Sequence, residues 1–460
     1  MGHATAYGNR HPIEIRLPVL YTFPSARTVR PPENTATTKG STMAKPARKP
    51  AAPVVRVSGM QTPNDRREAL DTILRAFTHP EHLEQHVAKA CWRGSYFNPD
   101  YTRIAVADGR VVSAVVLAPR TIRFGPARVP AMTVGTVATH DHYRKRGYNS
   151  VTMNDASAYM QANGVLVAYL GGIPDYYYRY GYYPFTTRGS AKFNREAARK
   201  EMTPARFRVM RKADLPAVAE LYDKANAASM CTADRPADLW QWLMGAGRNT
   251  WFFRGPYIVF DTAGKLCGYF TSRDKQNINI GEIVVRGDDA SCRAMLGALV
   301  SLAKRREVKD ISLPLPWNDP MAVFLRQYVP CEFTMNTNPT GGCLMKIVDF
   351  PRLMAALEPM FAERWRAADP KIAAARFTFE CELGSVGFSI AGGAVRVEPA
   401  ARSKAVVRVP QRWMSGLLTG YYDINEVLPR DGVLVPDRLK PVLRILFPKR
   451  WPWVHCGDNY

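Results

Sequence analysis

The stretch ATHDHYRKRGYNS, residues 138–150, carries three cations directly before a glycine and follows the apolar run AMTVGTVA, residues 131–138. This run is typical of a buried strand. From Gly147 onward, apolar residues recur at helical spacing, namely Val151, Ala156 and Met160. An Asn-Gly pair then supplies a helix stop, and VLVAYL predicts a short, fully buried strand. The order strand, basic turn, helix, strand predicts a βαβ unit with parallel strands, which places the basic turn at a helix N-terminus.

The basic turn has the composition of an anion-binding site. The first turn of a helix has free backbone N–H groups and the positive end of the helix dipole, and both favour a phosphate or a pyrophosphate. Arg144, Lys145 and Arg146 add charge-assisted hydrogen bonds, and Gly147 lets the backbone approach a ligand without a Cβ in the way. Taken alone, three cations and a glycine also fit a solvated charge run, so the neighbouring residues decide between the two interpretations.

Those neighbours resemble a known cofactor motif. VATHDHYRKRGYNS is similar to the acetyl-coenzyme A motif of GNAT superfamily N-acetyltransferases, in which a strand ending Val-x-Thr/Val precedes Arg-x-x-Gly-x-Gly/Ala. The resemblance implies that acetyl-coenzyme A is the cosubstrate. It also implies the residues that bind this cosubstrate, which are Val137, Thr139, Arg144, Lys145, Arg146, Gly147, Tyr148 and Asn149. Asn149 departs from the Gly or Ala of the pattern, which affects one close backbone contact to the pyrophosphate.

The stretch GGIPDYYYRYGYYPF, residues 171–185, is rich in tyrosine. Most of these rings are expected to cover an edge of the core. The pattern Tyr-x-Arg-Tyr-Gly-Tyr, from Tyr177 to Tyr182, resembles a segment of one GNAT branch, the enhanced-intracellular-survival type acetyltransferases. In that branch the first tyrosine protonates the departing coenzyme A thiolate. The resemblance therefore implies that Tyr177 is the general acid.

The last stretch is FPKRWPWVHCGDNY, residues 447–460. Packing of Trp451 and Trp453 on the third domain is one explanation for its aromatic content, because exposed tryptophans are costly in water. In the resembling branch, the last residue is aromatic and its α-carboxylate acts as the base. The resemblance implies this role for Tyr460, with the amine attacking the acetyl group directly in a ternary complex and without a covalent acetyl-enzyme.

A chain of 460 residues is long enough for about three domains. Residues 1–57 are basic and Pro-rich, and we expect a flexible tail; a targeting segment, or a start at Met43, are alternatives. The resemblance implies an α/β (α+β) fold in three parts: a catalytic GNAT domain at 58–200, a second GNAT-like domain without the cofactor motif at 201–350, and a sterol-carrier-protein-like domain at 351–460. Mixed central sheets flanked by helices are expected in the first two, and the C-terminal tail is expected to reach the active site.

Three local patterns make these expectations specific. TRIAVA, VVSAVVLA and AMTVGTVAT predict strands, with a polar loop between the last two, and PRLMAALEPMFAERWRAA predicts one helix at the start of the third domain. A hairpin turn is predicted at Ala263–Gly264.

Where the first domain has RKRGYN, the second has RGDDAS, whose Asp288 and Asp289 repel a pyrophosphate and are predicted to cap a helix. The second domain is therefore predicted not to bind the cofactor.

The composition limits the partners. A net charge of +23 and a pI of 9.8 favour anionic partners, but without a nucleic-acid-binding motif they predict no dedicated nucleic-acid site. No apolar run reaches the roughly 18 residues of a membrane-spanning helix. The eight cysteines form no CxxC pair and indicate reduced thiols of a cytoplasmic protein. THPEHLEQHV lacks the HExxH pattern, so no metal is predicted.

Two function classes remain at this point. The first is an acetyl-coenzyme A dependent N-acetyltransferase that acts on the primary amine of a small molecule or a peptide. The second is a non-catalytic relative with the same fold that binds a ligand or a lipid. The acceptor stays open: Asp141, Asp175 and Asp458 are candidates to hold a cationic amine, while a basic chain also fits a neutral or acidic acceptor. A homo-oligomer, a trimer or a hexamer, is what the resemblance implies.

Overall fold

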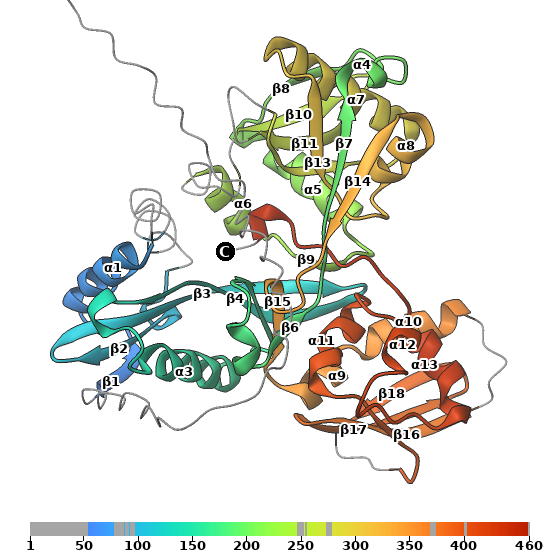
Figure 1. Ribbon diagram of the computed structural model, residues 1–460. Helices are drawn as coiled ribbons and strands as arrows, with labels where there is room; N and C mark the ends of the chain where they lie inside the picture. The colour runs from blue at the N-terminus through green and yellow to red at the C-terminus, as the bar shows by residue number, and fades with distance from the viewer. Residues whose placement is uncertain are drawn as a thin grey trace, which may run out of the picture. The chain divides into compact units, whose positions relative to one another are not determined.

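The first sheet begins at Val54, ahead of the predicted boundary at residue 58, because this strand pairs with the strand that starts at Thr102. The structure, a computed structural model, describes residues 54–77, 87, 92, 97–245, 253, 255–272, 278–368, 374–399 and 403–458. The sheet has the order β1-β2-β3-β4-β5-β15-β6, and β9 pairs with β3 (Figure 1). Its strands are β1 (Val54–Gly59), β2 (Thr102–Ala107), β3 (Arg110–Phe124), β4 (Ala127–Thr139), β5 (Val167–Gly172), β6 (Tyr182–Pro184), β9 (Met230–Ala233) and β15 (Gly342–Ile347).

Helices α1 (Pro63–Ala76) and α3 (Tyr148–Ala162) cover opposite faces of this sheet (Figure 1). Helix α3 buries Met153 and Met160 in one apolar cluster, whereas α1 buries Ile73 in another. The helix predicted between Gly147 and the stop at Asn163-Gly164 is confirmed as α3. Val151 was expected on its apolar face but is 40% exposed, since the buried face runs instead through Tyr148, Thr152 and Met153.

The predicted polar loop between VVSAVVLA and AMTVGTVAT is wrong. Strands β3 and β4 continue through this region as one long antiparallel hairpin, which turns only between Phe124 and Ala127. These residues form strands because their apolar side chains are buried against a later part of the chain. Ile122, Phe124 and Val129 belong to an apolar cluster shared with residues 350–447. On β4 the buried Ala127 and Val129 alternate with the exposed Arg128 and Pro130, as in a strand with one buried face.

The middle of the chain forms two smaller sheets. One has the order β12-β11-β10-β8 and the other β13-β7-β14. Their strands are β7 (Arg188–Asn194), β8 (Arg206–Val209), β10 (Pro256–Phe260), β11 (Leu266–Ser272), β12 (Ile280–Val285), β13 (Asp310–Pro314) and β14 (Cys331–Asn336). The helices are α4 (Arg195–Ala198), α5 (Leu215–Ala225), α6 (Ala237–Met244), α7 (Asp289–Arg305) and α8 (Pro320–Tyr328). The predicted hairpin turn is confirmed, with Gly264 at a φ of 77° between β10 and β11.

Two strands are exchanged across the predicted boundaries at residues 200 and 350. Strand β7 follows β6 in the sequence but lies between β13 and β14, and β15 follows β14 but lies between β5 and β6. Each of the two regions therefore completes a sheet of the other. The described residues belong to one compact unit, and this reciprocal exchange ties its first two regions together.

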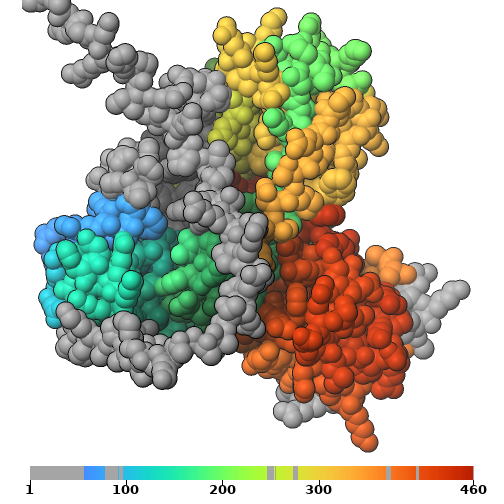
Figure 2. All heavy atoms as spheres, in the orientation of Figure 1, coloured from blue at the N-terminus to red at the C-terminus, as the bar shows by residue number. Residues whose placement is uncertain are grey.

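Residues 350–458 supply a third region, in which a four-stranded sheet of order β18-β17-β16-β19 is covered by helices. The helix predicted over PRLMAALEPMFAERWRAA is divided in two at Leu357, where Pro359 opens the second helix. The elements are α9 (Phe350–Ala356), α10 (Glu358–Ala368), β16 (Ala374–Cys381), β17 (Gly384–Ala391), β18 (Ala394–Glu398), β19 (Val406–Arg408), α11 (Gln411–Thr419), α12 (Ile424–Val427) and α13 (Lys440–Leu446). Figure 2 shows the atoms of this region, orange to red, as one packed body.

The interior of the third region is filled by aromatic rings. Phe377 and Phe388 stack with ring centroids 4.9 Å apart, and Phe379 and Phe447 stack at 5.3 Å. Phe361 contacts both Phe388 and Phe447 edge to face. The apolar face of this sheet is thus occupied by the protein's own side chains.

Several sequence predictions fall outside the described residues. They concern the tail before residue 54, the histidine-containing THPEHLEQHV segment and Tyr460. The seven cysteines that the structure describes are free thiols, in agreement with the prediction of reduced cysteines. Among the helices described, none is both long and apolar enough to cross a membrane.

Candidate active site

Strands β4 and β5 separate in the middle of the first sheet. They pair in parallel only where Ala131–Thr133 face Val167–Tyr169, although β4 continues to Thr139. A β-bulge lies just beyond this pairing, where Thr136 has a φ of 49° and the register with β3 shifts. The parallel ladder therefore stops before Val137 and Thr139, which leaves backbone groups of β4 facing the opening between the strands. A ligand with amide groups can pair with such a strand edge.

The basic turn joins this strand to α3. Gly147 is the N-cap residue of α3 and has a φ of 90°, a left-handed conformation that favours glycine. Arg144, Lys145 and Arg146 are exposed, and none of them forms an ion pair with a carboxylate among the described residues. The guanidinium of Arg146 lies 5.2 Å from the centre of the Tyr143 ring. The turn thus brings three unneutralised cations to the N-terminus of a 15-residue helix, as the sequence predicted.

Asn149, the residue that departs from the family pattern, points away from the basic turn. Its amide Nδ2 donates to the hydroxyl of Tyr176 over 2.5 Å. The next residue, Ser150, makes a second hydrogen bond to the tyrosine-rich turn, because its hydroxyl lies 2.9 Å from the hydroxyl of Tyr180. Burial raises the pKa of Tyr176 to about 12, so its hydroxyl stays protonated at neutral pH. These two contacts tie the first turn of α3 to the tyrosine-rich turn.

Tyr177 opens the tyrosine-rich turn (Tyr177–Tyr180) and is buried. Its ring packs edge to face against Tyr176 and Tyr182, with centroids 5.0 and 6.2 Å away. Gly172, at the end of β5, makes room for it, because a Cβ at this position would lie 2.7 Å from the Cδ2 of Tyr177. Tyr177 is therefore fixed against the end of β5, the strand that borders the opening. Tyr182 is also buried, as expected for a ring that covers an edge of the core.

The C-terminal segment passes against the first sheet. The backbone N–H of Trp453 donates to the carbonyl of Met230 over 2.9 Å, and the hydroxyl of Tyr169 donates to the carbonyl of Asp458 over 3.0 Å. Packing of Trp451 on the third domain was one explanation for the aromatic content of this segment, but its ring centre lies 6.3 Å from that of Trp317, which belongs to the middle region. The described part of the segment therefore runs between regions, and its Asp458 lies beside β5.

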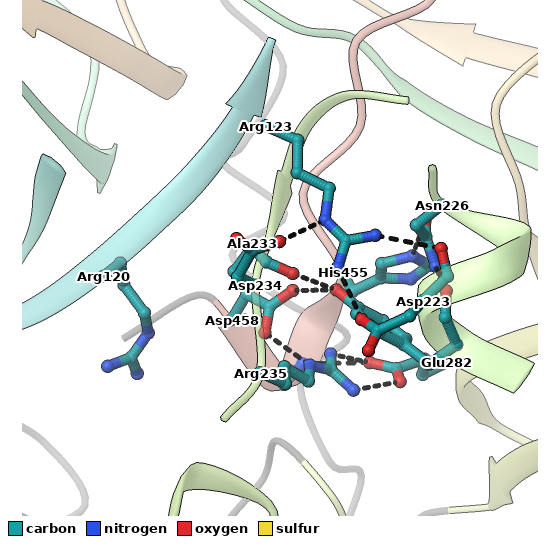
Figure 3. A network of polar contacts seen from close by, with 12 residues as sticks. Arg120, Arg123, Asp223, Asn226, Ala233, Asp234, Arg235, Glu282, His455 and Asp458 are labelled. Atoms are coloured by element: carbon teal, nitrogen blue, oxygen red, sulfur yellow. Dashed lines mark hydrogen bonds and ion pairs between the residues drawn. The ribbon is translucent and has the colours of Figure 1, made fainter. Parts of the chain in front are cut away.

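A buried ion network holds this segment (Figure 3). The Nε of Arg235 lies 2.7 Å from a carboxylate oxygen of Asp458, and its Nη1 and Nη2 lie 2.7 and 2.8 Å from the carboxylate of Glu282. The three side chains are fully buried. Tyr222 donates to Asp458 over 3.1 Å, and Tyr269 donates to Glu282 over 2.6 Å. Asp458 is thus committed to Arg235 and cannot serve as the acceptor-binding acid that the sequence suggested.

The charges in this network support each other. Burial alone raises the pKa of Glu282, but the adjacent Arg235 outweighs burial and brings that pKa down to about 2. The pKa of Arg235 is raised well above its usual value, because attraction to Asp458 and Glu282 exceeds the cost of burial. Burial lowers the pKa of His455, whose Nε2 lies 3.0 Å from the Oδ1 of Asn226. Glu282 and Arg235 are therefore both charged at pH 7, while His455 is neutral.

Sequence reasoning did not find Arg235, Glu282 or the bulge at Thr136. Arg235 is 223 positions from Asp458, and Glu282 is 175 positions from Gly457, the residue before Asp458; neither lies in a recognisable motif. The bulge lies inside a uniformly apolar run. The available signal was Arg235, two residues after the short segment MCTA, but an arginine close to the end of a strand is common.

Comparison with known proteins agrees with this geometry. Residues 60–185 match the model of a family described as an acetyltransferase (GNAT) domain. No curated protein matches the chain by sequence. The match covers the strands, the basic turn and the tyrosine-rich turn described above.

Solved structures match over most of the chain. A GCN5-related N-acetyltransferase from Kribbella flavida is 18% identical, with a TM-score of 0.68 over 88% of this chain and 98% of that one. A GCN5-related N-acetyltransferase from Anabaena variabilis is 14% identical, with a TM-score of 0.67 over 88% and 100%. Eis1 from Mycobacterium abscessus is 17% identical, with a TM-score of 0.59 over 88% and 100%. At these identities the likeness shows a shared fold.

Proposed function

We propose that the chain is a GNAT acetyltransferase that moves the acetyl group of acetyl-coenzyme A to a primary amine by direct attack in a ternary complex. The observation that carries the proposal is the conjunction of a separated β4–β5 pair with an uncapped, basic N-terminus of α3. We also propose that the chain is organised as two GNAT-like regions and a sterol-carrier-like third region.

The cofactor is proposed to lie in the opening between β4 and β5. Backbone groups near Val137 and Thr139 pair with the amide-bearing arm of coenzyme A, and the cations Arg144, Lys145 and Arg146 bind its pyrophosphate at the start of α3. Gly147 and the backbone of Tyr148 and Asn149 supply N–H groups of the first helical turn. Because the Asn149 side chain is turned to Tyr176, it does not occupy the space above the turn.

Tyr177 is proposed to protonate the departing thiolate. It lies next to the end of β5 and is buried, so its ring is held in place. A phenol with a pKa near 10 is protonated at neutral pH and can donate to a thiolate. This assignment rests on the resemblance and on the position of the ring.

The base is proposed to be the α-carboxylate of Tyr460, as the resemblance implies. Asp458, two residues earlier, is anchored beside β5, and two residues span at most about 7 Å. A carboxylate with a pKa of about 3.5 is a weak base for an amine of pKa about 10, so positioning must contribute most of its effect. One residue appended after Tyr460 should therefore lower turnover and leave cofactor binding unchanged; unaltered turnover removes this base.

A thiol-release assay tests the proposal as a whole. The full chain is incubated with acetyl-coenzyme A and a panel of primary amines, and free coenzyme A is measured with a thiol reagent. We expect amine-dependent release that requires Tyr177. Binding of acetyl-coenzyme A without release by any amine in the panel would favour the non-catalytic relative.

A further inference from the structure

A cleft of about 690 Å³ lies beside the C-terminal segment, because Arg235, one of its lining residues, binds Asp458. Its walls come from β3, from the segments around Asp223 and Asp234, and from the start of α6. This volume fits a small organic molecule. The cleft is separate from the basic turn at Arg144, which lies at the other end of β4.

The cleft has an excess of positive charge. Four arginines and two aspartates line it. Three of the arginines have carboxylate partners. Arg123 pairs with Asp223 and Asp234, and Arg128 pairs with Asp234 over 2.7 Å. Arg235 is held by the buried network of Glu282 and Asp458 (Figure 3). These three cations are neutralised within the protein.

Arg120 differs from these three arginines. It forms no ion pair with any carboxylate in the described part of the chain. Its Nη1 donates to the carbonyl of Pro119 over 2.8 Å, while its Nε is buried and has no hydrogen-bond partner. Figure 3 shows the guanidinium of Arg120 pointing away from the ion network. A charged donor that is withdrawn from water without a partner carries a free-energy cost, which a bound anion would remove.

The position of Arg120 on the sheet is fixed by the ladder. Arg120 faces Ala131, and Ala118, two residues earlier, faces Thr133, which in turn faces Tyr169. Residues two apart on a strand point to the same face, so Arg120 and Tyr169 lie on one face in adjacent rows. Tyr169 binds the carbonyl of Asp458 on this face. An occupant of the cleft would therefore lie next to the C-terminal segment.

We propose that this cleft binds a small organic anion, a carboxylate or a phosphate on an apolar body, with Arg120 as the residue that holds the charge. A planar guanidinium with free donors matches both oxyanions in two-point contact. Pro119, Pro236 and Leu239 provide apolar wall for the body of the molecule. The residues that line the cleft do not belong to the β4–β5 opening or to the basic turn, so coenzyme A bound there leaves the cleft free.

The experiment is a calorimetric titration of the full chain with matched probes. The probes are 4-phenylbutyrate, its uncharged amide 4-phenylbutyramide, and phenyl phosphate, each added in the presence of saturating coenzyme A so that the basic turn is filled. We expect one site per chain, at least tenfold tighter binding of an anion than of the amide, and weaker binding in high salt. Comparison of phenylbutyrate with phenyl phosphate shows which anion the cleft prefers.

Three variants make the titration decisive. Arg120→Gln should abolish the preference for the anion, and Arg120→Lys, which keeps the charge, should retain binding within a few-fold. Arg144→Gln, the matched control at the other basic site, should bind the probes like the parent chain. Equal binding of phenylbutyrate and its amide would overturn the proposal. Loss of anion binding in Arg144→Gln would also overturn it. Anion binding by Arg120→Gln as tight as that of the parent chain would overturn it as well.

Discussion

Helices α3 and α7 occupy equivalent places in the two βαβ units of the chain but begin in opposite ways. The strands that flank α3 pair in parallel, and a parallel bridge between Asn279 and Ser312 joins the segments that flank α7. Helix α3 begins at Gly147 without a side-chain cap. Helix α7 begins at Asp288, whose carboxylate accepts from the backbone N–H of Ser291 over 2.9 Å, and the predicted capping by this residue is confirmed.

The charged residues at the starts of α3 and α7 differ in the same way. Arg286 donates to Asp288 over 2.7 Å, and this bond holds the pKa of the aspartate well below its usual range. The polar groups at the start of α7 are thus satisfied by the protein itself. Those at the start of α3 are exposed cations without ion-pair partners among the described residues. This difference supports the proposal that the α3 turn binds an anionic ligand, whereas the α7 turn is satisfied by the protein's own groups.

The strands before these helices show the same contrast. Strand β4 leaves part of its edge unpaired by β5, whereas β12 contributes Glu282 to the buried network that holds the C-terminal segment. If this account is correct, changes in the α7 unit alter stability and changes in the α3 unit alter activity.

Glu282→Gln should have the largest effect, a decrease in the free energy of unfolding. It leaves Arg235 buried with one carboxylate instead of two, and breaking a buried ion pair typically costs about 3–5 kcal/mol. We expect the free energy of unfolding, measured by urea denaturation, to fall by about this amount. A fall below about 1 kcal/mol would show that the network is not a structural anchor.

Tyr177→Phe tests the α3 unit. The variant keeps the ring and its packing but removes the proton donor, so turnover should fall about 100-fold or more while acetyl-coenzyme A binding and stability stay unchanged. Steady-state kinetics and a binding titration check both parts. The matched control is Tyr178→Phe at a neighbouring, exposed ring, which should keep full activity. A Tyr177→Phe variant as active as the parent excludes Tyr177 as the acid.

Asp288→Ala tests the α7 turn. Loss of the N-cap should lower the free energy of unfolding by about 1 kcal/mol, because the N–H of Ser291 loses its acceptor. Acetyl-coenzyme A affinity should not change. A change in that affinity would contradict the structural role of this turn.

The smallest expected effect is a dependence of stability on pH. Burial lowers the pKa of His455 below 6.5 in the folded chain, so between that lowered value and about 6.5 the unfolded chain binds more protons than the folded one. Stability should therefore decrease by up to about 1 kcal/mol as the pH falls from 7 to 5.5. In His455→Gln the decrease, followed by thermal melts, should be smaller than in the parent; an equal decrease assigns it to other groups.

The sequence predicted features that depend on neighbouring residues. The basic turn, the helix after it and the cap at Asp288 follow from short-range patterns, and each was located to within a few residues. The reciprocal exchange of β7 and β15 could not be predicted in this way, because pairing partners there are over 100 residues apart. The same holds for Arg235 and Asp458, which meet across 223 positions. The polar loop was mispredicted because its burial depends on residues of the third region.

The measurement that tests the central claim most directly is a calorimetric titration of the full chain, and of Arg144→Ala, with acetyl-coenzyme A. The account predicts one site per chain and an affinity about 10- to 100-fold lower in the variant, since a charged hydrogen bond to the pyrophosphate is lost. No binding by the parent chain, or equal binding by both proteins, would contradict the assignment of the α3 turn as the cofactor site.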